Sequence, residues 1–374
     1  MKLAILGSVG VPGRYGGFET LADNLVQYHS RRAAQCSDMG VVTVYCSAQA
    51  YPQRSSSYLS AELRYSRFKA NGAQSVIYDI VTALDAVRRG HRELLFLGVS
   101  GAVVVPLIRL IAPRCWIVTN VDGIEWKREK WSGLAKAFLR LSEALAVRWS
   151  HVVVADNQAI AEHILESYGA DCDIIPYGGD HAVLPVSASP NVDMLSRLPE
   201  SYAFGLCRIE PENNVEMILE AFSETTAPLV FVGNWDNSEF GRSLKARFND
   251  QPNVWLLDPV YDPATLQALR RRATVYVHGH SAGGTNPALV EMMHFGIPVY
   301  AFDCSFNRHT TQNAAVYFGS KSDLAKNIEA DDGMAGESGL KMREIAQANY
   351  TWSLVSERYF DLMSRPSRPR SMDK

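Results

Sequence analysis

The stretch HGHSAGGTNPALVEMMHFGIPV, residues 278–299, carries the clearest structural signal in the chain. Gly283 and Gly284 remove side chains at points where a ligand would have to touch the backbone. Asn286 suits the N-cap of a helix and Pro287 its first position. The glycine and proline of the later FGIP segment stop the helix after about two turns. The pattern predicts a strand, a glycine-rich turn and a short, well-capped helix.

A helix start of this kind can hold a phosphate, because free N–H groups and the positive end of the helix dipole point at the ligand. Glu291 lies one turn into the helix, and its side chain leans back toward that end. A carboxylate repels phosphate but suits a sugar hydroxyl beside it. We therefore predict a nucleotide or nucleotide-sugar pocket, although an ordinary capped helix explains the same residues.

The bulk composition indicates a soluble globular protein of two domains. The chain has 374 residues, 47% hydrophobic and 21% charged, and one core seldom serves a chain of that length. No two of its six cysteines form a CxxC pair, which favours a reducing, cytoplasmic compartment. The N-terminal apolar segment, residues 2–6, is too short for a signal peptide.

The longest apolar run, residues 94–112, is interrupted by Pro106 and Arg109. A membrane-spanning helix needs about 20 apolar residues. We therefore expect a strand followed by a buried or interfacial helix here.

Charge is distributed unevenly along the chain. Residues 1–150 contain 19 Lys and Arg against 11 Asp and Glu, a balance of +8, whereas the remainder has a balance of −11. We expect an anionic partner surface, with no nucleic acid among the partners. The segment 126–131, WKREKW, has a composition that suits a lipid headgroup layer, or equally a solvated helix start.

The first half alternates short apolar runs with helical patterns, which predicts a parallel sheet covered by helices on both faces. The expected strands are 2–6, 41–46, 74–78, 94–97, 116–121, 151–155 and 173–176, and the clearest helices are 20–29, 81–88 and 133–149.

After a linker rich in Gly, Pro, Ser and Asp at 178–199, a second alternation follows. Its expected strands are 202–206, 229–232, 254–257, 275–278 and 299–302, and its helices are 215–222, 239–249, 263–273 and 287–295. We expect an N-terminal domain over 1–180, completed by an amphipathic helix at 352–363. A second domain would span 181–350, followed by a disordered tail at 364–374.

Four segments taken together resemble the GT-B glycosyltransferases, and more closely their family 4 of retaining enzymes. They are GSVGVPGRYGGFETLADNLV (7–26), TNVDGIEWKREKW (119–131), LCRIEPENNVEMILEAF (206–222) and the stretch 278–299. Within that family they are similar to bacterial rhamnosyltransferases of capsule and exopolysaccharide assembly. The resemblance implies an α/β fold of two Rossmann-like, doubly wound domains facing across a cleft.

The resemblance assigns donor-binding roles in the second domain. Arg208 matches an arginine that binds the donor diphosphate, and Asn213 stands where a lysine usually assists it. Glu291 matches the second of two glutamates eight positions apart and would contact the nucleotide ribose. Gly283 occupies the place of the first, which normally meets the sugar. This departure implies a donor sugar held by backbone, for which the 6-deoxy sugar rhamnose is a candidate.

The chemistry of such a transfer centres on the leaving group. Arg208 and the backbone around Gly284, Thr285 and Asn286 would meet the negative charge that grows on the departing nucleoside diphosphate. No carboxylate nucleophile can be assigned. The resemblance implies a same-face substitution in which the leaving phosphate assists acceptor attack.

Gly13, Gly16 and Gly17 crowd the loop after the first strand, but their spacing is not GxGxxG. We expect the loop to approach the donor phosphate or the acceptor, with Phe18 and Glu19 facing the acceptor; a plain turn is the alternative.

Asp122 follows the end of a strand and precedes a Gly turn. An α/β enzyme keeps catalytic groups at such positions, and the resemblance implies a place near the transferred sugar. An Asx turn would explain the same residue. The DxD match at 171–173 is set aside as a metal site, because acidic triplets are common by chance; we expect neither metal nor cofactor.

We thus expect a glycosyltransferase, peripheral at the inner face of the membrane, that transfers L-rhamnose from dTDP-L-rhamnose to a lipid-diphosphate-linked saccharide with retention. The alternatives are a GDP-mannose or UDP-sugar donor, a 2-epimerase of the same fold, and a non-catalytic nucleotide-binding partner. A Rossmann dehydrogenase is disfavoured by the missing fingerprint.

Overall fold

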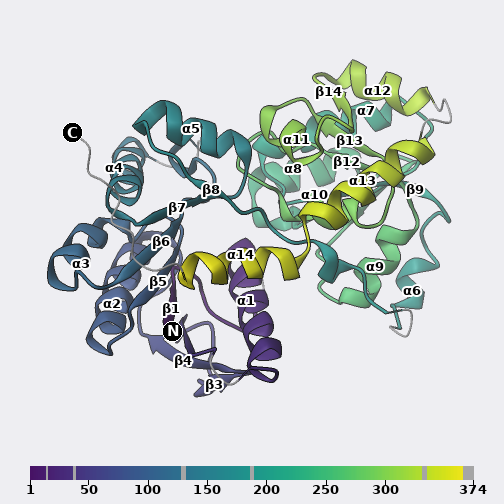
Figure 1. Ribbon diagram of the computed structural model, residues 1–374. Helices are drawn as coiled ribbons and strands as arrows, with labels where there is room; N and C mark the ends of the chain where they lie inside the picture. The colour runs from purple at the N-terminus through teal and green to yellow at the C-terminus, as the bar shows by residue number, and fades with distance from the viewer. Residues whose placement is uncertain (14–15, 37–38, 128–131, 186–188, 331–334, 365–374) are drawn as a thin grey trace. The chain divides into compact units, whose positions relative to one another are not determined.

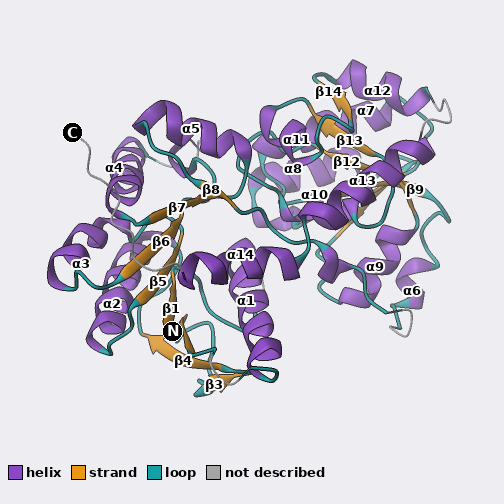
Figure 2. Cartoon of the chain, viewed as in Figure 1, coloured by secondary structure: helices purple, strands orange, loops and turns teal. Residues whose placement is uncertain are grey.

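The computed structural model describes residues 1–13, 16–36, 39–127, 132–185, 189–330 and 335–364. The chain forms two compact units, shown in Figures 1 and 2. The first unit contains Met1–Tyr177 and the C-terminal helix α14 (Trp352–Ser364), and the second contains Gly178–Thr351. Each consists of a sheet with helices packed against it (Figure 2).

The first unit has an eight-stranded sheet in the order β3-β4-β2-β1-β5-β6-β7-β8. All pairs are parallel except β3 with β4. The strands are β1 (Lys2–Leu6), β2 (Val41–Ser47), β3 (Ser57–Tyr58), β4 (Ala61–Ser66), β5 (Glu93–Leu97), β6 (Trp116–Asn120), β7 (Val152–Ala155) and β8 (Asp173–Ile174). The central strands are apolar runs because both of their faces are covered.

Helices cover the two faces of this sheet. On one face α2 (Ser75–Arg88), α3 (Val105–Ile111), α4 (Gly133–Trp149) and α5 (Gln158–Tyr168) follow one another, whereas α1 (Gly17–Ala33) and α14 pack together on the other (Figure 1). Helix α14 is anchored to β6, where the Trp116 indole donates to the Leu362 carbonyl (2.9 Å).

One predicted strand is wrong. Residues 74–78 form the end of a short 3₁₀ turn and the start of α2. The strands that were not predicted are β3 and β4 here and β14 (Val316–Phe318) in the second unit. The predicted run is only five residues long, too few for periodicity to separate a strand from a buried helical turn. Tyr78 is fully buried because it faces the sheet, where its hydroxyl donates to the Ser8 and Tyr45 carbonyls (3.0 and 2.8 Å).

The second unit has a six-stranded, fully parallel sheet in the order β11-β10-β9-β12-β13-β14. The strands are β9 (Tyr202–Leu206), β10 (Leu229–Val232), β11 (Val254–Leu257), β12 (Ala273–His278), β13 (Val299–Phe302) and β14 (Val316–Phe318). The order reverses direction at β9, so the sheet is doubly wound and its strand ends at β9 and β12 form a switch point.

The helices of the second unit are α6 (Val192–Leu195), α7 (Val215–Ser223), α8 (Glu239–Phe248), α9 (Pro263–Arg271), α10 (Pro287–Met293), α11 (Ser305–Thr310), α12 (Lys321–Glu329) and α13 (Ala335–Asn349). Helix α7 packs with α8 and α12, and α10 packs with α13. The core between α7, α8 and the sheet is built around Phe222, Phe231 and Trp235.

Residues 94–112 form the end of β5, a 3₁₀ turn and α3, which confirms the expected strand and helix. Across the part of the chain that the structure describes, no helix is both long and apolar enough to span a bilayer. The expected disordered tail begins at Ser364, the last residue of α14, and its residues 365–374 lie outside the described residues.

Candidate functional site

The loop between β12 and α10 has the predicted local structure. The Asn286 side chain accepts from the Ala288 N–H (2.9 Å), and Pro287 begins the helix. Gly283 has φ +122°, and a Cβ built on it would lie 2.9 Å from His280 Nε2. The turn therefore requires glycine, and its backbone passes directly against an imidazole.

The backbone donors that this loop can offer a ligand are few. Pro287 has no N–H, so any backbone donor to a ligand must come from the residues before it. Helix α10 ends at Met293, two residues earlier than predicted. Because α10 has only two turns, its dipole is short, and the loop can contribute to anion binding only through oriented N–H groups.

Asn213 joins the loop after β9 to the loop after β12. Its amide donates to the Arg208 carbonyl (2.6 Å), and its side-chain oxygen accepts from His280 Nδ1. The next residue, Asn214, donates to the Gly279 carbonyl (2.8 Å). Asn213 is buried and its amide is bonded on both sides, so it holds the two loops together.

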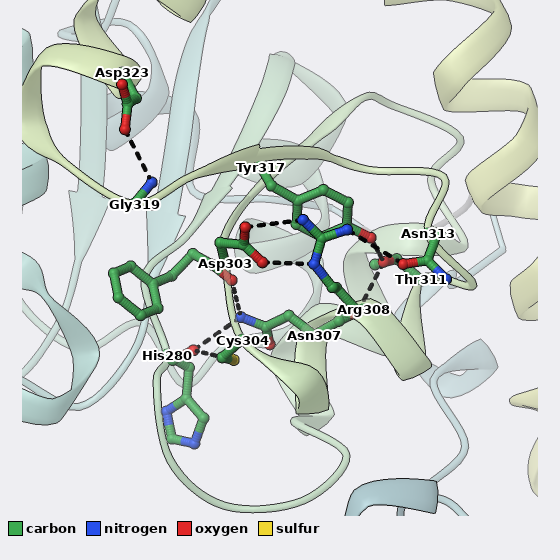
Figure 3. A network of polar contacts seen from close by, with 11 residues as sticks. His280, Asp303, Cys304, Asn307, Arg308, Thr311, Asn313, Tyr317, Gly319 and Asp323 are labelled. Carbon is green, nitrogen blue, oxygen red and sulfur yellow. Dashed lines mark hydrogen bonds and ion pairs between the residues drawn. The ribbon is translucent and has the colours of Figure 1, made fainter.

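The His280 backbone is held from the side of α11, as Figure 3 shows. The Asn307 amide donates to the carbonyls of His280 and Phe302 (2.8 Å each). The Cys304 thiol also donates to the His280 carbonyl (3.6 Å). His280 is thus fixed by its ring and by its backbone.

The neighbouring turn is closed by an ion pair (Figure 3). The Arg308 guanidinium donates to both Asp303 carboxylate oxygens (2.5 and 2.8 Å) and lies over the Tyr317 ring, 4.1 Å from its centroid. These hydrogen bonds hold the pKa of Asp303 below its usual range. The pair satisfies its own charges, so we assign it a structural role.

Arg208 follows β9 and is exposed. Its only ion pair among the described residues is a long one, 3.5 Å from Nη1 to Glu210 Oε1. An exposed pair of this kind holds a side chain weakly. The guanidinium can therefore turn to an anionic ligand.

Glu291 has two side-chain partners that the sequence analysis had not connected with it. Its carboxylate accepts from the buried Arg270 guanidinium of α9, and its other oxygen lies 3.4 Å from His181 Nε2. Burial alone would raise the pKa of Glu291, but Arg270 and His181 lower it below its usual value. No local sequence signal predicts these partners, because all three residues come from different elements.

In the first unit, the Glu19 side chain is bonded to its own glycine-rich loop. Glu19 Oε1 accepts from the Val9 N–H (2.7 Å), and burial raises the pKa of this carboxyl. Gly16 has φ +117° and a Cβ there would collide with the Glu19 carboxylate, while the Gly13 N–H donates to Asp23 (3.0 Å). The loop is therefore tied to α1 at two points.

The residues after this loop pack against other strand ends. A Cβ on Gly17 would lie 3.3 Å from the Tyr177 hydroxyl, and one on Gly98, just after β5, would lie 3.2 Å from the Phe18 ring. Phe18 is thus a packing residue that covers the end of β5 rather than one turned outward.

Asp122 lies two residues after the end of β6. Its N–H donates to the Asn120 side-chain oxygen (2.8 Å) in an Asx turn, and its φ is +59°. Asn120 in turn donates to the Tyr359 hydroxyl (2.6 Å). The pKa of Tyr177 is raised mainly by burial and next by the Asp122 charge. The carboxyl edge of this sheet therefore brings together Asp122, Tyr177 and Gly17.

Two further sequence features lie elsewhere. The acidic triplet 171–173 leads into β8, and within the described ranges no group of three or more His, Cys, Asp or Glu is arranged to hold a metal ion. In the segment 126–131, the Trp126 indole turns inward and donates to Glu143 (3.2 Å), while 128–131 fall outside the described residues.

Comparisons with known proteins agree with this architecture. Residues 1–180 match a family model described as a domain of unknown function (DUF1972). No curated protein sequence matches the chain.

Solved structures of several proteins resemble it over nearly its full length. Sucrose-phosphate synthase from Thermosynechococcus elongatus matches at 15% identity, with a TM-score of 0.77 and coverage of 96% of this chain and 97% of that one. HepE (Alr3699) from Anabaena, in complex with UDP, matches at 15% identity, a TM-score of 0.72, and 97% and 100% coverage. A glycosyltransferase from Rickettsia africae matches at 11% identity, with a TM-score of 0.68 and coverage of 96% of this chain and 97% of that one. The chain has the two-domain α/β GT-B fold, with a Rossmann-like parallel sheet in each unit.

Proposed function

We propose that the protein is a glycosyltransferase whose second unit binds a nucleotide-sugar donor. The observation that carries the proposal is the pair of loops after β9 and β12, joined by Asn213. They combine an exposed arginine, Arg208, with a glycine-rich turn that leads into the capped start of α10. Guanidinium and oriented amides are the donors that a diphosphate requires. The UDP complex of the HepE structure, which shares this fold, supports the assignment.

The proposed reaction breaks the anomeric C–O bond to the donor diphosphate. The acceptor hydroxyl oxygen forms the new bond on the same face of the sugar, and its proton passes to the departing phosphate oxygen. Arg208 and the N–H groups of Gly284, Thr285 and Asn286 neutralise the charge that develops on the leaving group. Asp122 acts near the transferred sugar. The proposal needs no metal, so transfer should persist in a chelator.

We propose L-rhamnose, carried by dTDP, as the donor sugar. Gly283 has no side chain, and residues with a side chain rarely adopt its φ of +122°. At this position the loop therefore presents its backbone to the sugar rather than a carboxylate. A 6-deoxy sugar has one hydroxyl fewer to be recognised. A GDP-mannose or UDP-sugar donor is the alternative within the fold.

For the acceptor we propose a lipid-diphosphate-linked saccharide of cell-surface polysaccharide assembly, such as capsule or exopolysaccharide, met at the inner face of the membrane. The balance of +8 in residues 1–150 supports an anionic acceptor bound by the first unit.

The test is release of nucleoside diphosphate from dTDP-L-rhamnose, UDP-glucose and GDP-mannose, with and without a lipid-diphosphate disaccharide. Acceptor-dependent release of dTDP, with a rhamnosylated lipid product, supports the proposal. Acceptor-dependent release of UDP or GDP overturns the sugar and keeps the activity. Conversion of a UDP-sugar without acceptor indicates an epimerase, and binding without turnover indicates a non-catalytic partner.

A further inference from the structure

Large apolar side chains are exposed on two adjacent helices of the first unit. Helix α3 exposes Leu107, Leu110 and Ile111, and α4 exposes Leu134 and Leu141. Leu110 and Leu134 are 79% and 87% exposed to solvent. Leucines on a soluble surface normally occur singly. Several on two helices that pack together are an exposed apolar set of the kind that marks a docking site.

The two helices pack against each other on one face of the first sheet (Figure 1). Along α4 the buried residues Leu139, Ser142 and Ala146 face the protein, whereas Leu134 and Leu141, seven residues apart, share the outer side. We name Leu107, Leu110, Ile111, Leu134, Leu141 and Trp149 the α3–α4 surface.

The exposed charges on α3, on α4 and on the turn after α3 are of one sign. Arg114, Arg140 and Arg148 are exposed, and Lys136 lies in the first turn of α4. The one acidic residue of α3 and α4, Glu143, is buried and bonded to the side chains of Trp126, His163 and Tyr168. Its charge is therefore withdrawn from the surface.

We propose that the α3–α4 surface docks onto an anionic lipid bilayer. Leucines that enter the acyl boundary, surrounded by arginines that pair with lipid phosphates, are the combination that interfacial binding requires. The inference deepens the proposed function and rests on its lipid-linked acceptor. Helix α4 starts shortly after Asp122 on the chain, at the same carboxyl edge of the sheet. A lipid anchor held at this surface would bring its saccharide toward that edge.

The same observations argue against a second copy of the chain as the occupant. A twofold interface would set the arginines of one copy against those of the other, and like charges facing each other oppose association. An anionic bilayer neutralises them. The Trp126 ring, turned inward to Glu143, contributes no anchor of its own.

The experiment is co-sedimentation of the full-length chain with vesicles of phosphatidylcholine alone, or mixed with an equal amount of phosphatidylglycerol. We expect the chain to bind the anionic vesicles, and high salt to weaken this binding. Binding to the neutral vesicles should be weak. The variant Leu110→Ser/Leu134→Ser should bind at least about tenfold more weakly. Arg114→Glu/Arg148→Glu should lose at least about 25-fold, since each basic residue near such a surface contributes about fivefold.

The matched control is Val192→Ser/Leu340→Ser, which removes two exposed apolar side chains from the second unit and should bind like the unaltered chain. All changed positions are exposed, so thermal unfolding should be unaltered in each variant. Light scattering of each protein without vesicles reports its oligomeric state.

Three results would overturn the proposal. They are no binding of the unaltered chain to anionic vesicles, equal binding of all variants, and a change of oligomeric mass in the α3–α4 variants without vesicle binding, which would assign the surface to self-association. Donor binding measured in parallel separates the two proposals. Nucleotide binding without vesicle binding would contradict only the proposed docking surface. Vesicle binding without nucleotide binding would contradict only the proposed glycosyltransferase activity.

Discussion

Arg208 and Glu291 were both predicted from sequence motifs, but their surroundings differ, so substitution should affect stability differently at the two positions. Arg208 is exposed with one long ion pair, whereas Glu291 neutralises a buried guanidinium. A loss of activity after substitution means something different at each position. Stability and activity must therefore be measured together.

Arg208→Ala should reduce kcat by about 10²–10³ without changing the melting temperature, because one preorganised donor to the leaving group is lost. Steady-state transfer kinetics and thermal unfolding check this. Arg242→Ala, an exposed arginine on α8 in the same unit, is the control and should keep full activity. Unchanged kcat in Arg208→Ala would remove this residue from the site.

Glu291→Ala should lower the free energy of unfolding at neutral pH by about 3–5 kcal/mol, because it leaves buried Arg270 without its partner. The pKa of Glu291 is lower in the native than in the unfolded state, so its stabilisation is present above the unfolded value of about 4.3 and disappears as pH falls through the native one. Urea unfolding at neutral and acidic pH should show the variant and the unaltered chain converging at low pH. A constant difference would contradict the pairing.

Asp79→Asn should stabilise the protein above about pH 7. Burial raises the pKa of Asp79 to about 7, with a Ser100 hydrogen bond opposing the shift. Between about pH 4 and pH 7 the native state keeps a proton that the unfolded state has lost, so stability falls as pH rises. At about 1.4 kcal/mol per pKa unit, the variant gains up to about 4 kcal/mol above pH 7. Urea unfolding across pH tests this, with exposed Asp250→Asn expected to change nothing.

At the scale of elements, local chemistry explains what sequence could predict. The cap of α10 was predictable because Asn286 and Pro287 act on neighbouring N–H groups. Residues 74–78 were misassigned because a short apolar run has no decisive period, and the two-residue β3 gives almost no pattern. The partners of Glu291 and Asn213 come from distant elements, so only the folded chain reveals them.

Gly283→Ala tests the turn between β12 and α10. The left-handed φ and the approach to His280 should cost about 1–3 kcal/mol of stability and weaken donor binding. Gly133→Ala is the matched control, because a Cβ there meets nothing within 4 Å at the start of α4. That change should be neutral or slightly stabilising. Thermal unfolding of both variants gives the comparison, and equal stability would contradict the strain.

At the scale of the whole molecule, the sequence resemblance predicted the GT-B fold, and the solved structures confirm it. The alternation of strands and helices accounts for this success, because it allows few topologies. Sugar and acceptor remain proposals, since a fold of this kind supports many transfers and specificity lies in a few side chains.

The central claim is that the second unit binds a nucleoside diphosphate, and a thermal-shift comparison of dTDP, UDP, GDP and NAD tests it most directly. A ligand that binds only the native state raises the melting temperature with concentration. The account predicts a saturable shift with dTDP, smaller shifts with UDP and GDP, none with NAD, and loss of the dTDP shift in Arg208→Ala. A shift with NAD alone, or no shift with any of the three diphosphates, would contradict it.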